Sequence, residues 1–269
     1  MSIIKNDFEK TNITKIKKYK NNKKLTVITA YDALFAKLFE EIADMILVGD
    51  SLNMSFAGRP DTLSATLEQM IYHTKAVCTG ASKAFVILDM PFGTYINKDI
   101  ALTNAVKVYA QTNAAAIKIE GGEDKADIIK HLTSNSIAVM GHIGLMPQYV
   151  RSEGGYKVRG KTKEDEEQLI RDAIAVEKAG AFAIVVEGVM SNVAKKITNA
   201  VNIPIIGIGA GNVTDGQVLV WSDMLGFFEE FKPKFVRHYL NGAKLVKKAV
   251  NSYRDDVQTQ NFPSKEEEY

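Results

Sequence analysis

Four carboxylates and one histidine directly follow or close short apolar runs of the sequence: Asp50, Asp89, Glu120, His142 and Glu187. If those runs form parallel strands, their carboxyl ends face one side of the sheet and bring the five groups together. Clustered carboxylates repel one another unless a cation or shared protons offset the charge. The pattern therefore predicts a site for metal-assisted or acid–base chemistry.

The ligand types in this set favour Mg²⁺. One histidine and no cysteine accompany the carboxylates, and an oxygen-rich set suits Mg²⁺ better than zinc or copper. Magnesium usually takes one or two protein carboxylates and keeps positions for water and substrate oxygens. We expect Asp50 and Asp89, on neighbouring strands, to bind the metal directly, and Glu120 to be a third or a water-mediated ligand. Glu187 lies several strands further along and is free to act across the substrate as a general base.

Lys118 precedes Glu120 by two residues and therefore shares its face of the strand. Two interpretations stay open for this lysine. It forms a structural ion pair with Glu120, or its charge stabilises a developing enolate or holds a substrate carboxylate.

Other polar and glycine-rich segments carry weaker signals. Asp32 is expected to cap the helix that follows it, His73 to be a packed or hydrogen-bonded helix residue rather than a ligand, and Cys78 to be an inert, small apolar side chain. The glycines of Ile206–Gly211 are compatible with a phosphate cradle or with a tight turn. Gly154–Gly160 is compatible with a mobile flap or with an ordered surface loop.

The elements that must position these groups follow a regular order along the chain. Continuous apolar runs, typical of parallel strands covered by helices, alternate with stretches long enough for a helix. Eight runs are the number that a (β/α)8 barrel requires. The expected strands are Thr26–Ala30, Met45–Gly49, Ala84–Leu88, Ala114–Glu120, Ile137–Gly141, Phe182–Glu187, Ile203–Ile208 and, weakly, Gln217–Val220.

Amphipathic spacing predicts helices between these strands. Tyr31–Ala43 has a stripe of Leu and Phe at spacings of three and four, Lys163–Ala179 opens with charged residues, and a further helix begins near Ser64. No linker-like segment interrupts the series, so we expect one barrel domain over residues 1–269. A basic segment, residues 1–24, would contain a helix before the barrel, and residues 254–269 would form a polar tail.

Composition excludes several classes of protein. The 269 residues are 46% hydrophobic and 25% charged, which is ordinary for a globular chain, and the formal net charge is +2. That balance gives no electrostatic reason to expect nucleic acid or an anionic membrane as partner. The single cysteine excludes an intrachain disulfide and suits a reducing compartment. Without a signal peptide or a spanning run, the chain is expected to be cytoplasmic.

Several motifs, in the same order along the chain, resemble those of the ketopantoate hydroxymethyltransferase (3-methyl-2-oxobutanoate hydroxymethyltransferase) family. The resemblance runs from about Lys15 to Phe262-Pro263 near the end of the chain. Motifs this numerous and in this order make the resemblance specific. They are Thr29–Asp32, Val48–Leu52, Asp89–Gly93, Lys118–Gly122, Gly141–Gln148, Gly154–Val158, Ile206–Gly211 and Asp215–Gln217.

The resemblance implies a (β/α)8 barrel of the phosphoenolpyruvate and pyruvate superfamily, a Mg²⁺ ion and a homodecamer. It also implies transfer of a hydroxymethyl group from 5,10-methylenetetrahydrofolate to 3-methyl-2-oxobutanoate, the first committed step of pantothenate synthesis. The family's sites fall on matching positions of this chain. The metal ligands are Asp50, Asp89 and Glu120, the oxoacid contacts are Asp50, Ser51, Asp89 and Lys118, and the proton acceptor is Glu187.

Two details keep alternatives open within this picture. His142 lies in a family motif and would either act directly in catalysis or orient Glu187 or a water. Asn53-Met54 and Gly188 depart from the residues common at these positions in the family, which bears on loop shape and substrate fit.

Two rival functions stay open. The chain would be a Mg²⁺-dependent lyase or mutase acting on another 2-oxoacid, or a barrel that only binds a metabolite.

Overall fold

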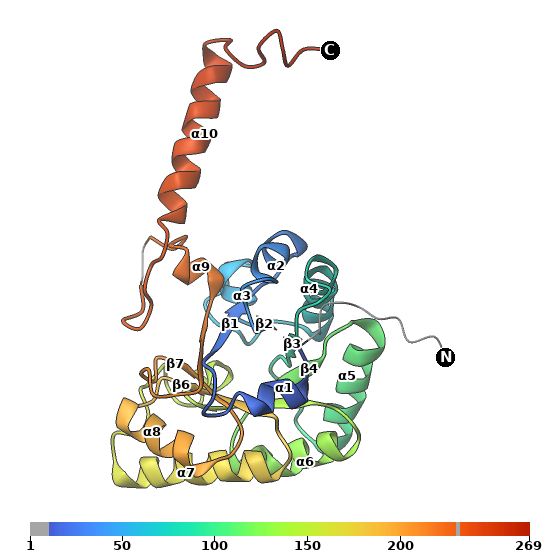
Figure 1. Cartoon of the computed structure of the whole chain (residues 1–269), viewed down its shortest axis with the longest axis vertical. Helices are drawn as coiled ribbons and strands as arrows, with labels where there is room; N and C mark the ends of the chain where they lie inside the picture. Colours follow the sequence, from blue (N-terminus) through green and yellow to red (C-terminus); the bar gives the residue numbers. More distant parts are fainter. Residues whose placement is uncertain (1–10, 230–231) are drawn as a thin grey trace. The chain divides into compact units, whose positions relative to one another are not determined.

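The computed structural model describes residues 11–229 and 232–269 of the chain. Eight parallel strands form a closed barrel in the order of the sequence, and β8 pairs with β1 (Figure 1). The expected (β/α)8 barrel is confirmed, and each of the eight expected runs overlaps a strand, although some of the strand ends differ from the predicted bounds. The strands are β1 (Leu25–Thr29), β2 (Met45–Val48), β3 (Val86–Asp89), β4 (Ala116–Glu120), β5 (Val139–Gly144), β6 (Ala183–Glu187), β7 (Ile205–Ile208) and β8 (Gly216–Leu219).

The chain divides into two compact units, one ending at Leu219 and the other running from Val220 to Tyr269. The first unit contains the whole barrel. The expectation of a single domain over residues 1–269 stays a prediction.

Helices alternate with the strands of the first unit (Figure 1). The expected cap at Asp32 is confirmed, because its side chain accepts a hydrogen bond from the backbone N–H of Phe35. The helix expected near Ser64 begins at Leu67, where Thr66 and Gln69 form a capping box. The helices are α1 (Ile13–Lys18), α2 (Ala33–Phe39), α3 (Leu52–Ser55), α4 (Leu67–Gly80), α5 (Lys98–Gln111), η1 (Glu123–Lys125), α6 (Ala126–Ser134), η2 (Pro147–Tyr149), α7 (Lys163–Lys178) and α8 (Ser191–Ala200).

The basic segment before the barrel contains the expected helix in a shortened form. Helix α1 ends at Lys18, and Lys20 donates to the Asp215 carboxylate and the Thr198 carbonyl at 2.8 and 2.7 Å. These contacts join the segment to the ends of other elements. Residues 1–10 of the predicted segment lie outside the described residues.

The prediction that the apolar stripe of Tyr31–Ala43 belongs to an amphipathic helix packed on the barrel is wrong in part. Phe39 and Ala36 are buried, but Leu34, Leu38 and Ile42 are between 60% and 70% exposed. Spacing of three and four placed the apolar residues on one side of the helix, and that side only partly faces the barrel.

The inner layer of the barrel is apolar toward the amino ends of the strands. Phe85 and Phe182 pack there in a T-shaped pair, with ring centroids 5.5 Å apart. Ile16 of α1 belongs to the same buried cluster and is fully shielded from solvent. Strand residues on both faces are buried because side chains fill the interior and helices cover the outside.

A glycine closes the barrel at the seam between β8 and β1. A side-chain carbon added at Gly216 would lie 2.5 Å from the Leu25 carbonyl oxygen and 2.8 Å from a methyl group of Ile206. Only a residue without a side chain allows the two strands to approach this closely.

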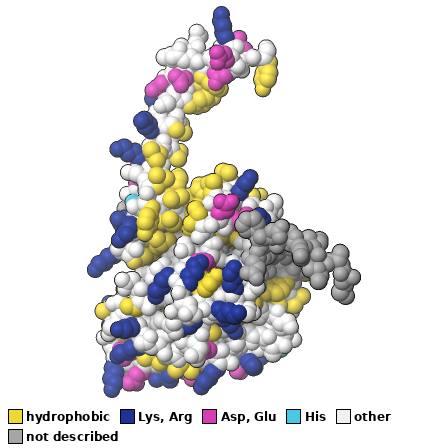
Figure 2. Space-filling view, viewed as in Figure 1, with side chains coloured by type: hydrophobic (Ala, Val, Ile, Leu, Met, Phe, Trp, Pro, Cys, Tyr) yellow, Lys and Arg dark blue, Asp and Glu magenta, His cyan; other side chains and the backbone are white. Residues whose placement is uncertain are grey.

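The second unit contains α9 (Trp221–Met224) and α10 (Gly242–Gln258). Helix α10 includes residues 254–258, so the predicted polar tail begins in a helix and continues in turns. Several hydrophobic side chains of α10 are exposed, and Figure 2 shows hydrophobic groups along this helix. Across residues 11–229 and 232–269, no helix is long and apolar enough to cross a membrane.

Candidate active site

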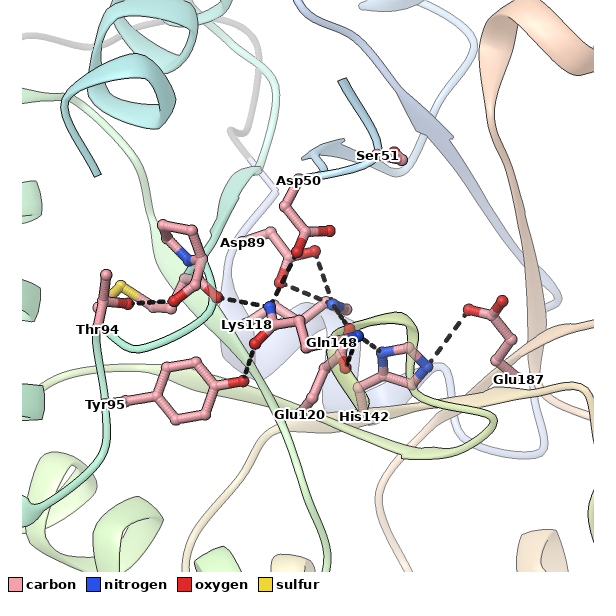
Figure 3. Close-up of polar contacts among 12 residues, drawn as sticks. Asp50, Ser51, Asp89, Thr94, Tyr95, Lys118, Glu120, His142, Gln148 and Glu187 are labelled. Carbon is pink, nitrogen blue, oxygen red and sulfur yellow. Dashed lines mark hydrogen bonds and ion pairs between the residues drawn. The ribbon is translucent and has the colours of Figure 1, made fainter. Parts of the chain in front are cut away.

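The strand-end groups converge at the carboxyl end of the barrel (Figure 3). Asp89 and Glu120 are the last residues of β3 and β4, and Glu187 is the last residue of β6. His142 lies within β5, in register with Glu120 of β4. Asp50 comes two residues after β2.

The Lys118 ammonium lies closer to the Asp89 carboxylate than to the Glu120 carboxylate. Its Nζ donates to both carboxylate oxygens of Asp89 at 2.7 Å, whereas Glu120 Oε1 lies 3.8 Å away. The register explains this choice, because Asp89 stands directly opposite Lys118 on the neighbouring strand. The ion pair between Lys118 and Glu120 that was one of the two interpretations is present, and Asp89 is a second and closer partner.

Burial couples the pKa values of the three carboxylates, so that the charge of each one shifts the pKa of its neighbours. Burial raises the pKa of Asp50 well above its ordinary value, and the charges of Asp89 and Glu120 raise it further. Burial also raises the pKa of Asp89 against the opposing charge of Lys118. Although burial raises the pKa of Glu120 too, contacts with His142 and Lys118 lower it more. A second cation near Asp50 would stabilise its charged form.

His142 lies between two carboxylates. Its Nδ1 is 3.5 Å from Glu120 Oε1, and its Nε2 is 3.4 Å from Glu187 Oε2. Burial and the charge of Lys118 lower the pKa of His142, but the two glutamates raise it to a net value of about 9. The two glutamates thus favour the positively charged imidazolium, although neither lies at close hydrogen-bond distance from the ring.

Glu187 differs from the other acids in its accessibility. Its side chain is 19% exposed, whereas those of Asp89 and Glu120 are 3% and 0% exposed. It lies on the far side of His142 from the other carboxylates (Figure 3). A molecule bound at this end of the barrel could therefore reach the Glu187 carboxylate.

Ser51 is the residue that the family resemblance adds to the strand-end groups. It directly follows Asp50 and precedes α3. Its Oγ lies 2.8 Å from the hydroxyl oxygen of Tyr31, at the end of β1. The hydroxyl is thus held at the same end of the barrel as the acids.

Sequence reasoning missed Gln148 and Tyr95. The amide of Gln148 donates to Asp50 Oδ2 at 2.9 Å and accepts a hydrogen bond from the Tyr95 hydroxyl. The backbone N–H of Gln148 donates to Glu120 Oε2 at 3.0 Å. A polar residue directly after a proline in the loop that follows β5 was the available signal.

The donor set fits a magnesium ion that takes few ligands from the protein. Glu120 Oε1 is buried without a hydrogen-bond partner in the described part of the chain. As the side chains stand in residues 11–229 and 232–269, no group of three or more His, Cys, Asp or Glu side chains is arranged to hold a metal. The ligand set stays a prediction: Asp50 and Asp89 bind directly, Glu120 is a third or water-mediated ligand, and substrate oxygens complete the set.

The two departures from the family pattern have local structural roles. Asn53 is buried, and its side-chain amide donates to the Asp61 carbonyl at 2.7 Å and to the Ser64 hydroxyl at 3.0 Å. Gly188 has a φ of 57°, and a side-chain carbon there would lie 2.9 Å from Leu145. Both residues shape loops around the acids without removing a polar group.

The glycine-rich segments differ in how tightly they are packed. A side-chain carbon at Gly207 would lie 2.8 Å from the Thr214 hydroxyl, which is the geometry of close packing. At Gly155, with φ of 118°, no atom would lie within 4 Å. Beyond it, Arg159 pairs with Val189 through an isolated β-bridge and with Asp165 through an ion pair. The phosphate and flap interpretations stay predictions.

Two open clefts flank the loop that carries Gln148. Their volumes are about 390 and 200 Å³, and both are partly lined by Phe92, Gln148 and Ser152. Tyr149 and Lys125 line the smaller one and Arg151 the larger one. The clefts therefore combine aromatic side chains with two cations that already have acidic partners: Arg151 pairs with Asp61 at 2.9 Å and Lys125 with Asp124 at 3.1 Å.

Comparison with known proteins identifies relatives along the whole chain. Residues 10–265 match the family described as ketopantoate hydroxymethyltransferase. A protein of Aliarcobacter butzleri (strain RM4018), named 3-methyl-2-oxobutanoate hydroxymethyltransferase, is 88% identical over 269 residues and is covered in full, as is this chain.

Solved structures with little sequence identity share the fold. Phosphonopyruvate hydrolase superposes with a TM-score of 0.62 at 13% identity, over 97% of this chain and 93% of the other. The lyase of 2,3-dimethylmalate, a member of the PEP mutase/isocitrate lyase superfamily, gives 0.57 at 16% identity, over 94% and 88%. At this level of identity, the two structures show that the chain shares their fold.

Proposed function

Because the chain belongs to the ketopantoate hydroxymethyltransferase family, we propose that it converts 3-methyl-2-oxobutanoate to 2-dehydropantoate with 5,10-methylenetetrahydrofolate as one-carbon donor. This reaction is the first committed step of pantothenate synthesis. The observation that carries the proposal is the arrangement of an accessible base, Glu187, beside a buried set that pairs the Lys118 ammonium with the Asp89 carboxylate.

Mg²⁺ is the proposed metal, held by Asp50 and Asp89 with Glu120 as a third or water-mediated ligand. When bound, it supplies Lewis-acid chemistry that acidifies the C3–H of the oxoacid and stabilises negative charge on its oxygens. Support comes from the oxygen-only donor set and from the buried Glu120 Oε1 without a hydrogen-bond partner in the described residues.

The oxoacid is proposed to bind against Asp50, Ser51, Asp89 and Lys118. Lys118 places a buried positive charge next to Asp89, where it can also donate to a carboxylate or enolate oxygen of the substrate. The Ser51 hydroxyl, held by Tyr31, is available to orient the bound molecule.

Glu187 removes the proton from C3 in this proposal, and His142 positions it. The C–H electron pair passes into the enolate, whose C3 then forms a bond to the methylene carbon of the donor. The bonds from that carbon to the two donor nitrogens break, and water supplies the hydroxyl oxygen of the product. One nitrogen takes up the proton released by that water and the other the proton held by Glu187, which returns the base to its charged form. Since His142 Nε2 lies 3.4 Å from Glu187 Oε2, the protonated imidazole stabilises the charged base before the transfer.

The clefts beside Gln148 offer room for the second substrate. Their aromatic wall and the nearby Lys125 and Arg151 suit a pterin ring and an acidic tail.

We also propose that the enzyme works as a homodecamer in the cytoplasm, which sedimentation and fractionation measurements would test.

Proton NMR in deuterated buffer tests the reaction. The purified protein, Mg²⁺ and methylenetetrahydrofolate should remove the C3 proton signal of 3-methyl-2-oxobutanoate and produce a hydroxymethyl signal. C3 exchange without product would reject the folate donor, and exchange or cleavage of another 2-oxoacid without folate would favour a lyase. No change in either signal would reject the substrate.

Glu187→Gln tests the base. The substitution keeps the size of the side chain, so the oxoacid should still bind, whereas C3 exchange should fall by roughly 10²–10⁴-fold. Glu164→Gln, at an exposed position in the first turn of α7, is the matched control. Exchange at the wild-type rate in Glu187→Gln would remove this residue from the mechanism.

A further inference from the structure

We propose that Gln148 is a positioning residue that holds Asp50 and Glu120 in place to receive the metal, and that Tyr95 fixes the orientation of its amide. The inference rests on the proposed function for the identity of the ligand that these acids bind. Gln148 is 4% exposed and lies in η2, in the loop that follows β5 (Figure 3).

Gln148 contacts two of the three buried carboxylates through different groups. Its side-chain Nε2 donates to Asp50 Oδ2 at 2.9 Å, and its backbone N–H donates to Glu120 Oε2 at 3.0 Å. Lys118, in contrast, gives its hydrogen bonds to Asp89. One loop residue therefore supplies donors to the two acids that the lysine does not hold at hydrogen-bond distance.

The surroundings of the amide define which end faces Asp50. Nε2 also donates to the Met90 carbonyl at 2.9 Å, and Oε1 accepts from the Tyr95 hydroxyl. A rotated amide would place its oxygen against the Met90 and Asp50 oxygens, which are acceptors. Met90 and Tyr95 both belong to the loop after β3, so two loops meet at this amide.

A neutral donor suits this position for an electrostatic reason. It engages one oxygen of Asp50 without adding a charge that would compete with a divalent cation for the carboxylate. A second lysine would neutralise the acid, and a carboxylate would repel it. The amide thus orients Asp50 and leaves its charge available.

A measurement of metal affinity, which does not depend on turnover, tests this role. The probe is Mn²⁺ alone, titrated into each protein and followed by electron paramagnetic resonance. Gln148→Ala should raise the Kd by roughly 10–100-fold, as expected when the residue that orients a metal ligand is lost. Gln168→Ala, which removes an amide-to-Asp172 hydrogen bond on α7, is the matched control and should leave the Kd unchanged.

Two further variants separate positioning from simple packing. Gln148→Glu keeps the shape but replaces the donor with an oxygen, so it should bind Mn²⁺ no better than Gln148→Ala. Tyr95→Phe should raise the Kd less, and it should add nothing in the Gln148→Ala background because both changes act through one amide. These variants also carry the test if Gln148→Ala does not fold.

The outcomes separate this inference from the proposed reaction. Wild-type Mn²⁺ affinity in Gln148→Ala, restored affinity in Gln148→Glu, or no Mn²⁺ binding by the wild-type protein would overturn the role of Gln148. The expected pattern of affinities in a protein that forms no hydroxymethyl product would leave that role intact and reject the proposed function.

Discussion

The two ends of the barrel interior use the same strands for opposite purposes. Toward the amino ends, Ala116 and Met140 belong to an apolar cluster, and two residues further along the same strands Lys118 and His142 are buried charged or polar groups. An apolar layer is stabilised by burial alone, whereas buried charges need partners. The comparison indicates that one end supplies stability and the other supplies chemistry at a cost in stability.

Lys118→Met should have the largest effect and tests how strongly the buried charges at this end depend on their partners. The substitution leaves the buried Asp89 without its partner, which typically costs about 3–5 kcal/mol of unfolding free energy. Turnover should also fall because the ammonium at the reacting end is lost. Denaturant unfolding and steady-state kinetics would measure the two losses.

Lys98→Met is the control for that experiment. Lys98 pairs with Asp127 at the surface, where both side chains are more than half exposed, so the expected change is under about 1 kcal/mol. Equal losses in the two variants would contradict the special role of the buried pair.

Phe182→Ala tests the apolar end. The ring is 2% exposed and packs on Phe85, so its loss should lower the unfolding free energy by about 3–5 kcal/mol. Turnover per folded molecule should stay unchanged. Ile42→Ala, at a 70% exposed position, is the control. A large fall in kcat of the folded Phe182→Ala variant would contradict the separation of stability at one end from chemistry at the other.

Asp215→Asn tests a charge that lies just before β8, at the apolar end. Its carboxylate accepts from the Lys20 ammonium at 2.8 Å and from the Ile205 backbone at 2.9 Å. Losing the charged hydrogen bonds should cost about 1.5–3 kcal/mol, measured by denaturant unfolding. Because this pair is structural, kcat and the Mg²⁺ dependence should not change; a tenfold fall in either would assign it a second role.

Asp223→Asn should have the smallest effect and shows what burial does to an acid outside the cluster. Burial raises the pKa of Asp223 to about 6, from an ordinary value of about 3.9. Its protonated form is therefore favoured by folding, so the contribution of this group to stability is highest below about pH 4 and declines as pH rises toward 6. Unfolding curves between pH 4 and 7 should lose this decline in the variant. The same slope in both proteins would contradict the assignment.

The sequence predicted the barrel and the acids at its rim for one physical reason. Parallel strands buried on both faces produce continuous apolar runs, and the residues that end them must lie at the same face. Asp50, Asp89, Glu120 and Glu187 were found in this way, and the structure places them at one end. Their roles in the reaction remain proposals.

Features that depend on register and on loops could not be read from the sequence. The pairing of Lys118 with Asp89 follows from the alignment of β3 and β4, which periodicity does not specify. Gln148 and Tyr95 meet because two loops approach each other, and neither residue ends an apolar run. The prediction for the apolar stripe on α2 was partly wrong for a related reason. Spacing predicts which residues share one side of a helix, but not which element packs against that side.

The seam of the barrel has a consequence for aggregation through strand pairing. In an open sheet, the outermost strands present unpaired N–H and C=O groups to which other chains can add. Here β1 and β8 pair with each other, so each of the eight strands has two neighbours and the sheet offers no edge. That protection depends on Gly216, whose hydrogen atom stands where any side chain would hold the two strands apart.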